Sequence, residues 1–168
     1  MELPGKTYLV SVAEISTIYV GFSALLVGLR QAKGGLTKYD SYFTESFIQL
    51  GFIVAACALM PALVALYGLE ESLVWRVSGV LSALPILIFV ASIPRRRRAA
   101  TGAPVPIFVR TMLVVQASAG GLMLFVAAWS PSKAAAIYST AVTVMLFSSC
   151  VAYLYVLDVI RPRTEQRN

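Results

Sequence analysis

The chain has 168 residues, of which 58% are hydrophobic and 13% are charged, and its formal net charge is +6. Soluble domains carry about 25% charged residues, so this composition argues against a water-soluble enzyme, a disordered chain and a separate globular domain. The chain contains no histidine and only two cysteines, with no CxxC motif. These counts remove histidine-based catalytic, zinc and haem sites and give no sign of a disulfide framework. We therefore expect a non-enzymatic membrane protein without metal or cofactor.

Five apolar runs are long enough to cross a bilayer as helices, which takes about 20 residues each. In chain order they cover about residues 8–29, 46–67, 73–93, 107–129 and 134–157. Pro94 and the run Arg95–Arg98 mark the end of the third, and the turn at residues 130–133 separates the fourth from the fifth. The sequence thus predicts an all-α bundle of five transmembrane helices in a single membrane domain, residues 1–168, with no soluble domain.

The basic residues predict the orientation of this bundle, because cytoplasmic segments collect Lys and Arg. The first run is about 22 residues long, contains Glu14 and is followed by positive charge, so it is not a cleaved signal peptide. With the N-terminus outside and the C-terminus cytoplasmic, eleven of the 14 basic residues fall on the cytoplasmic side: Arg30, Lys33, Lys38, Arg95, Arg96, Arg97, Arg98, Arg110, Arg161, Arg163 and Arg167. We expect a multipass protein of a bacterial inner membrane.

Small residues form one face of each of the first two spans. Such faces let helix backbones approach closely in lipid, so we expect these two to contact each other, although self-association would use the same residues. The opposite stripe of the first span, which includes Val12, Tyr19 and Phe22, suits acyl chains. The two small faces are Glu14, Thr17, Gly21, Ala24 and Gly28 in the first span, and Gly51, Ala55, Ala58, Ala62 and Ala65 in the second.

Ionisable side chains inside a span are costly and usually face the bundle interior. Glu14 and Arg76 both lie a few residues inside the outer ends of their spans. We expect them to pair or to share a polar site, either as an interhelical ion pair or as a site for an ion or ligand. The third alternative is that both side chains extend towards the membrane surface and do not contact each other.

A second polar cluster is expected at the cytoplasmic edge, where Glu45 and Gln49 open the second span, Arg110 opens the fourth and Asp158 closes the fifth. Pairing of Glu45 with Arg110, or of Arg110 with Asp158, would tie three helices together. Gln116 lies near the midplane of the fourth span and is expected to hydrogen-bond to a neighbouring helix.

Arg95, Arg96, Arg97 and Arg98 form a dense charge run beside the membrane. Arginines in this position determine topology and attract anionic lipid headgroups. Nucleic acid is not an expected partner, since no soluble domain accompanies the run.

Two functions fit these patterns. The small-residue faces favour a protein that acts by helix-mediated association, as a homo-oligomer or as a subunit of a larger membrane complex. The alternative is a small oligomeric channel or transporter for an ion or small solute, with Glu14, Gln116 and the hydroxyl-rich fifth span along the route. The expected partners are the bilayer, anionic lipid headgroups and another membrane protein or a second copy.

Overall fold

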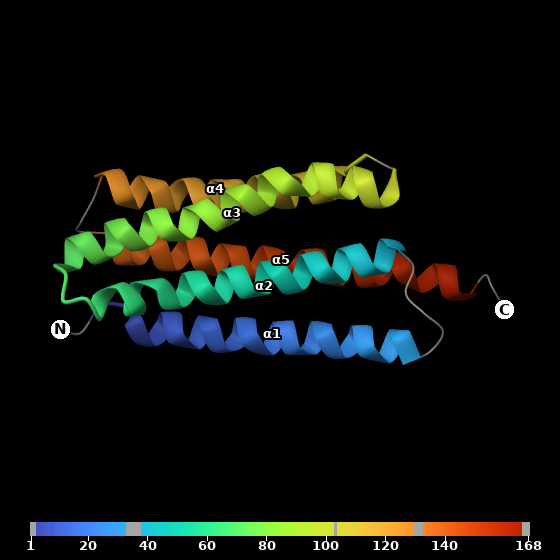
Figure 1. The fold of residues 1–168 in the computed structure, drawn as a ribbon, viewed down its shortest axis with the longest axis horizontal. Coiled ribbons are helices and arrows are strands. Elements are labelled where there is room, and N and C mark those ends of the chain that lie inside the picture. The colour runs from blue at the N-terminus through green and yellow to red at the C-terminus, as the bar shows by residue number, and fades with distance from the viewer. Residues whose placement is uncertain (1–2, 33–37, 103, 130–132, 166–168) are drawn as a thin grey trace.

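The computed structural model describes residues 3–32, 38–102, 104–129 and 133–165 and consists of five long helices (Figure 1). They are α1 (Lys6–Ala32), α2 (Lys38–Ala65), α3 (Glu71–Thr101), α4 (Ile107–Trp129) and α5 (Ala134–Glu165). Each is long and apolar enough to cross a membrane, and many of their large apolar side chains point outward, as Ile18, Ile88 and Phe147 do. The protein therefore has the build of a multipass membrane protein, as the sequence predicts.

The helices run up and down, so that the two termini lie at opposite ends of the bundle (Figure 1). Consecutive helices pack against each other, and α5 also contacts α1, α2 and α3. Among the described residues, the backbone of α1 does not closely approach that of α3 or α4, and the backbone of α2 does not closely approach that of α4. The helix α5 is thus the central member of the bundle, and α1 and α4 are its flanks.

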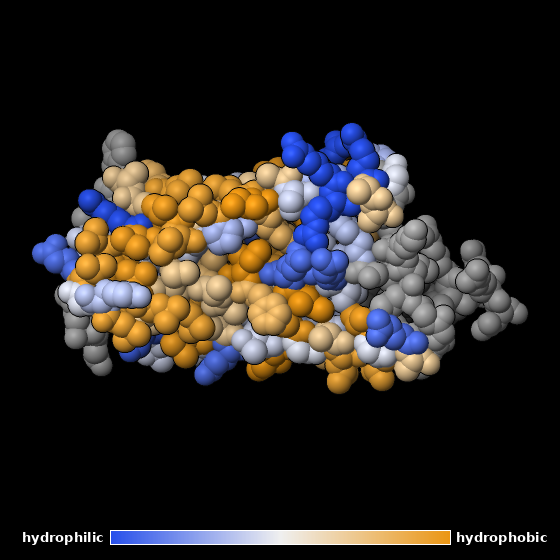
Figure 2. Space-filling model, in the orientation of Figure 1, coloured by the Kyte–Doolittle hydropathy of each residue, from blue (hydrophilic) through white to orange (hydrophobic). Residues whose placement is uncertain are grey.

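Helix α3 is longer than the sequence predicts. It continues past Pro94 and the arginine run to Thr101, and it ends at Gly102, whose positive φ of 67° and N–H bond to the Arg98 carbonyl, 2.9 Å long, form a C-terminal cap. A proline removes one intrahelical hydrogen bond, but it does not end this helix. We call the end of the bundle where α3 carries Arg95–Arg98 the arginine end, and hydrophilic residues gather there (Figure 2).

The contact between α1 and α2 differs from the predicted one. The small face of α2 is used, because a Cβ at Gly51 would clash with Cγ2 of Val20 and crowd the Tyr19 ring. The face of α1 that fills this space carries Val12, Tyr19 and Val20 rather than the small residues. Large side chains of α1 thus pack against the space that Gly51 leaves open on α2. The expectation that the two small faces meet is therefore wrong.

A hydrogen bond in the middle of the bundle joins three helices. Pro61 lies inside α2 and has no N–H to donate to the carbonyl of Cys57, four residues earlier. The hydroxyl of Tyr138 on α5 donates to that carbonyl at 2.6 Å and lies 2.5 Å from Oγ of Ser82 on α3. Both side chains are fully buried. A side chain of α5 therefore satisfies the backbone group that Pro61 leaves without a partner.

This arrangement predicts a coupled pair of substitutions. Tyr138→Phe should lower the free energy of unfolding by about 1–3 kcal/mol, the usual cost of leaving a buried acceptor unsatisfied. In a Pro61→Ala background the loss should be smaller, because the N–H of the new alanine can bond to the Cys57 carbonyl. Unfolding in mixed micelles of the four proteins in this double-mutant cycle measures the coupling. Equal losses in both backgrounds would contradict the pairing.

Candidate functional site

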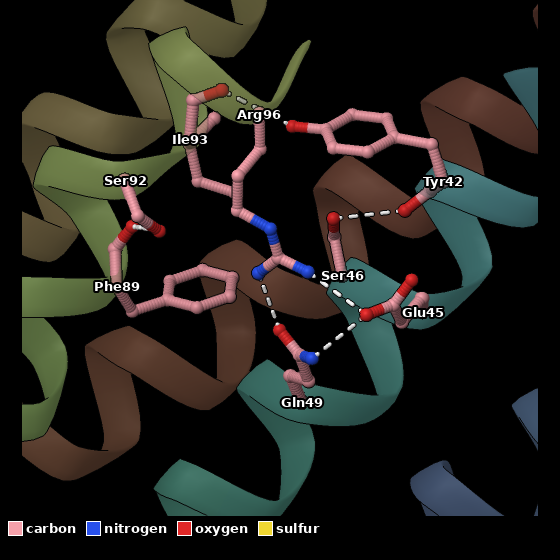
Figure 3. Close-up of polar contacts among 8 residues, drawn as sticks. All are labelled: Tyr42, Glu45, Ser46, Gln49, Phe89, Ser92, Ile93 and Arg96. Carbon is pink, nitrogen blue, oxygen red and sulfur yellow. Dashed lines mark hydrogen bonds and ion pairs between the residues drawn. The ribbon is translucent and has the colours of Figure 1, made fainter. Parts of the chain in front are cut away.

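At the arginine end, three side chains from two helices form a closed polar group (Figure 3). Nη2 of Arg96 lies 2.9 Å from Oε1 of Glu45, and Nη1 donates to Oε1 of Gln49 at 2.6 Å. Nε2 of Gln49 donates to the same Glu45 oxygen at 3.0 Å. Glu45 and Gln49 are one turn apart on α2, and Arg96 comes from the part of α3 beyond Pro94. The group ties α2 to α3.

This group corrects the predicted edge network. The sequence correctly places Glu45 beside Gln49, but the cation is Arg96 rather than Arg110. Arg110 is exposed on α4, and α4 does not contact α2. Asp158, the fourth residue of that prediction, lies in α5, but its side chain is outside the part of the chain that the structure describes. The sequence-based prediction ends the third span at Pro94 and so leaves Arg96 out of the network. In the structure α3 continues past Pro94, and this brings the Arg96 side chain alongside the first turns of α2.

The four consecutive arginines have different surroundings, because successive residues of a helix point about 100° apart. Arg96 pairs with Glu45, and Arg97 is only 4% exposed, with its guanidinium 5.3 Å from the centre of the Phe43 ring. Arg95 and Arg98 are exposed. The expectation that all four arginines contact lipid headgroups is therefore wrong for Arg97, whose side chain is buried.

A cavity of about 70 Å³ lies beside Arg97, between α2, α3, α4 and α5. Across it, α2 and α4 face each other without contact. Its wall is largely aromatic and aliphatic, with Phe47, Leu50, Phe89 and Leu113 among the lining residues. Sequence patterns did not reveal this cavity, because it depends on where four helices fail to meet.

Gln116 lines the same cavity and is 2% exposed. Its Nε2 lies 3.0 Å from the carbonyl oxygen of Met145 and 2.7 and 3.2 Å from the hydroxyls of Ser148 and Ser149, all on α5. The sequence anticipated a bond of this kind to a neighbouring helix. The amide oxygen Oε1 is buried and makes no hydrogen bond with the described residues. The amide is thus held in place through its nitrogen, while its oxygen lacks a donor from this part of the chain.

Glu14 and Arg76 are not brought together. Both side chains are exposed, Glu14 on α1 and Arg76 on α3, and these two helices do not contact each other. The expected pairing within one chain is therefore wrong, because α2 packs against both helices and keeps them apart (Figure 1). Glu14 lies on an outward face of α1 together with Thr17, Gly21, Ala24 and Gly28.

The groups expected along a channel route are also separated. Gln116 is enclosed between α4 and α5, whereas Glu14 points away from the bundle on α1, which does not contact α4. Three hydroxyls of α5 donate to carbonyls of their own helix: Thr143 to Ser139 at 2.7 Å, and Ser148 and Ser149 to Met145. The described residues of one chain therefore place these groups in different surroundings rather than along one path.

No group of three or more His, Cys, Asp or Glu side chains gathers as a metal site within the described part of the chain. Comparisons with protein-family models, curated proteins and solved structures find no match to this chain. The exposed face of α1 and the cavity are therefore the two features of the structure that bear on function.

The polar group at the arginine end makes a selective prediction. Arg96→Gln should lower the free energy of unfolding by less than about 1 kcal/mol, because the ion pair is partly exposed, with 33% and 57% of the two side chains accessible. Arg110→Gln should have no measurable effect. Unfolding of both variants in the same micelles distinguishes them, and a larger effect at Arg110 than at Arg96 would restore the network expected from sequence.

Proposed function

We propose that the protein acts by helix-mediated association with a second copy of itself, through the outward face of α1. This face consists of Glu14, Thr17, Gly21, Ala24 and Gly28, and we call it the Glu14 face. The proposal rests mainly on the exposed carboxyl group of Glu14, which lies inside an apolar span and for which the described residues provide no hydrogen bond or ion pair.

The position of Glu14 makes an uncovered carboxyl group costly. It is eight residues along α1 from Lys6, or about 12 Å by helix rise. Charged side chains facing lipid at depth cost a few kcal/mol, and they usually face other protein or a water-filled space. A second protein surface over Glu14 would remove this cost and supply a hydrogen-bond partner.

The rest of the Glu14 face fits a closely approaching helix. A Cβ added at Gly21 or Gly28 would meet no other atom within 4 Å, so these positions leave the backbone of α1 open to the outside. Glu14, Gly21 and Gly28 are spaced by seven residues, the period at which two helices stay in contact when they supercoil. The same stripe on two copies gives a self-complementary, twofold interface.

We propose further that the N-terminus is outside and the C-terminus is cytoplasmic, in a bacterial inner membrane. The distribution of basic residues supports this orientation. It places the arginine end, with Arg95 and Arg98 exposed, at the cytoplasmic surface, where anionic lipid headgroups are available to them.

Cysteine crosslinking tests the association. In a background with both native cysteines replaced by alanine, Gly21→Cys should form a covalent dimer in native membranes on mild oxidation. Phe22→Cys is the matched control, because it lies at the same depth but points about 100° away from Gly21, and it should remain monomeric. Adding Glu14→Leu should weaken dimerisation by about 3- to 30-fold, the usual effect of an interhelical polar contact.

The crosslinking results distinguish association with a second copy of the chain from association with a different protein. A monomeric Gly21→Cys protein, with no crosslinked product in native membranes, would overturn the proposal. A crosslink to a different protein at Gly21 would replace the second copy by a partner subunit. Glu14→Gln, which keeps the hydrogen-bonding capacity, should dimerise more strongly than Glu14→Leu.

Labelling of single cysteines tests the orientation. In the same background, Lys133→Cys should react with a membrane-impermeant maleimide in intact cells, whereas Arg98→Cys should react only after the membrane is permeabilised. Both native side chains are exposed, so accessibility depends on the side of the membrane rather than on burial. The reverse pattern would invert the proposed topology.

A further inference from the structure

We infer that the cavity between α2, α3, α4 and α5 is a binding site for a small apolar molecule that carries a hydroxyl group. The ligand's hydroxyl would donate to Oε1 of Gln116, and its apolar body would lie against the phenyl and aliphatic side chains of the wall. This inference is independent of the association proposed for the Glu14 face, which lies on another helix.

The hydrogen-bond acceptor of the proposed site is the side-chain oxygen of Gln116. Gln116 is 2% exposed, and Oε1 is a buried oxygen without a hydrogen bond. Its amide cannot rotate to another orientation without losing the contacts of Nε2 with α5. Such an acceptor normally costs about 1–3 kcal/mol when it is left unsatisfied, so a donor supplied from outside is favoured.

The hydroxyl groups on the cavity wall cannot provide this donor, because each has an acceptor nearby. Tyr42 donates to the carbonyl of Ile93 at 3.3 Å, and Ser46 donates to that of Tyr42 at 2.8 Å (Figure 3). Ser148 and Ser149 both donate to the carbonyl of Met145, at 3.0 and 2.6 Å. The wall therefore presents an acceptor and no hydroxyl proton for it.

The size, apolar character and charge of the cavity wall indicate which kind of hydrogen-bond donor could bind there. A water molecule needs about 10–15 Å³ and two to four polar partners, whereas this cavity offers about 70 Å³ lined largely by apolar side chains. The guanidinium of Arg97 on the wall disfavours ammonium groups. A neutral hydroxyl on an apolar body, as in a phenol or an aliphatic alcohol, would donate to Oε1 and place its apolar body against the apolar part of the wall.

A matched pair of probes tests the inference. With the full-length protein in lipid nanodiscs, fluorine NMR follows saturable binding of 4-fluorophenol and fluorobenzene, with empty nanodiscs correcting for partition into lipid. The wild-type protein should prefer 4-fluorophenol by about 5- to 150-fold, the ratio expected for satisfying one buried acceptor. Gln116→Met should reduce this ratio to about one.

Two further variants keep the test decisive. Leu113→Trp should fill the cavity and abolish binding of both probes, even if Gln116→Met does not fold. Gln31→Met removes an exposed amide on α1 that is not on the cavity wall and should leave binding unchanged. Equal binding of the two probes by the wild-type protein, or binding that survives both Gln116→Met and Leu113→Trp, would overturn the assignment.

Discussion

In a bilayer every backbone carbonyl needs a partner from protein, since lipid supplies none, and this constraint organises the bundle. Pro61 leaves the carbonyl of Cys57 without its helical donor, and the hydroxyl of Tyr138 takes that place at 2.6 Å. The bond fixes α5 against α2, while the contact of Tyr138 with Ser82 brings α3 to the same point. With α5 central, α1 and α4 become flanks. The uncovered face of α1 and the cavity bordered by α4 both follow from this arrangement.

Many polar side chains of the spans find partners within the chain, in two ways. Some form a closed group, as Arg96 does with Glu45 and Gln49. Others bond to the backbone of their own helix, as Ser16 does to the carbonyl of Val12 at 2.8 Å. The Glu14 carboxyl group and the Gln116 oxygen belong to neither class. For these two groups we propose partners from outside the chain, a second copy for Glu14 and a small molecule for Gln116.

Much of the fold could be predicted from the sequence, because crossing a bilayer requires a long apolar run and five such runs are present. The site was less predictable. The sequence gives the period of a helix face but not which neighbour lies opposite, so the groove at Gly51 was matched with the wrong stripe of α1. The sequence shows that Pro94 has no backbone N–H to donate, but it does not show that the helix continues beyond this residue. The pairing of Arg96 with Glu45 and Gln49 could therefore not be predicted. The cavity at Gln116 depends on the relative positions of four helices, and no local pattern records these.

The position of Tyr138 has a consequence for biogenesis. Helix α5 is the last of the five to leave the ribosome, yet it supplies the donor for a carbonyl in α2 and a partner for Ser82 in α3. Earlier spans can enter the membrane while these groups still await their partner, so final consolidation is delayed until residue 138 has been inserted. Chains interrupted before that point would retain an unsatisfied backbone carbonyl in the bilayer.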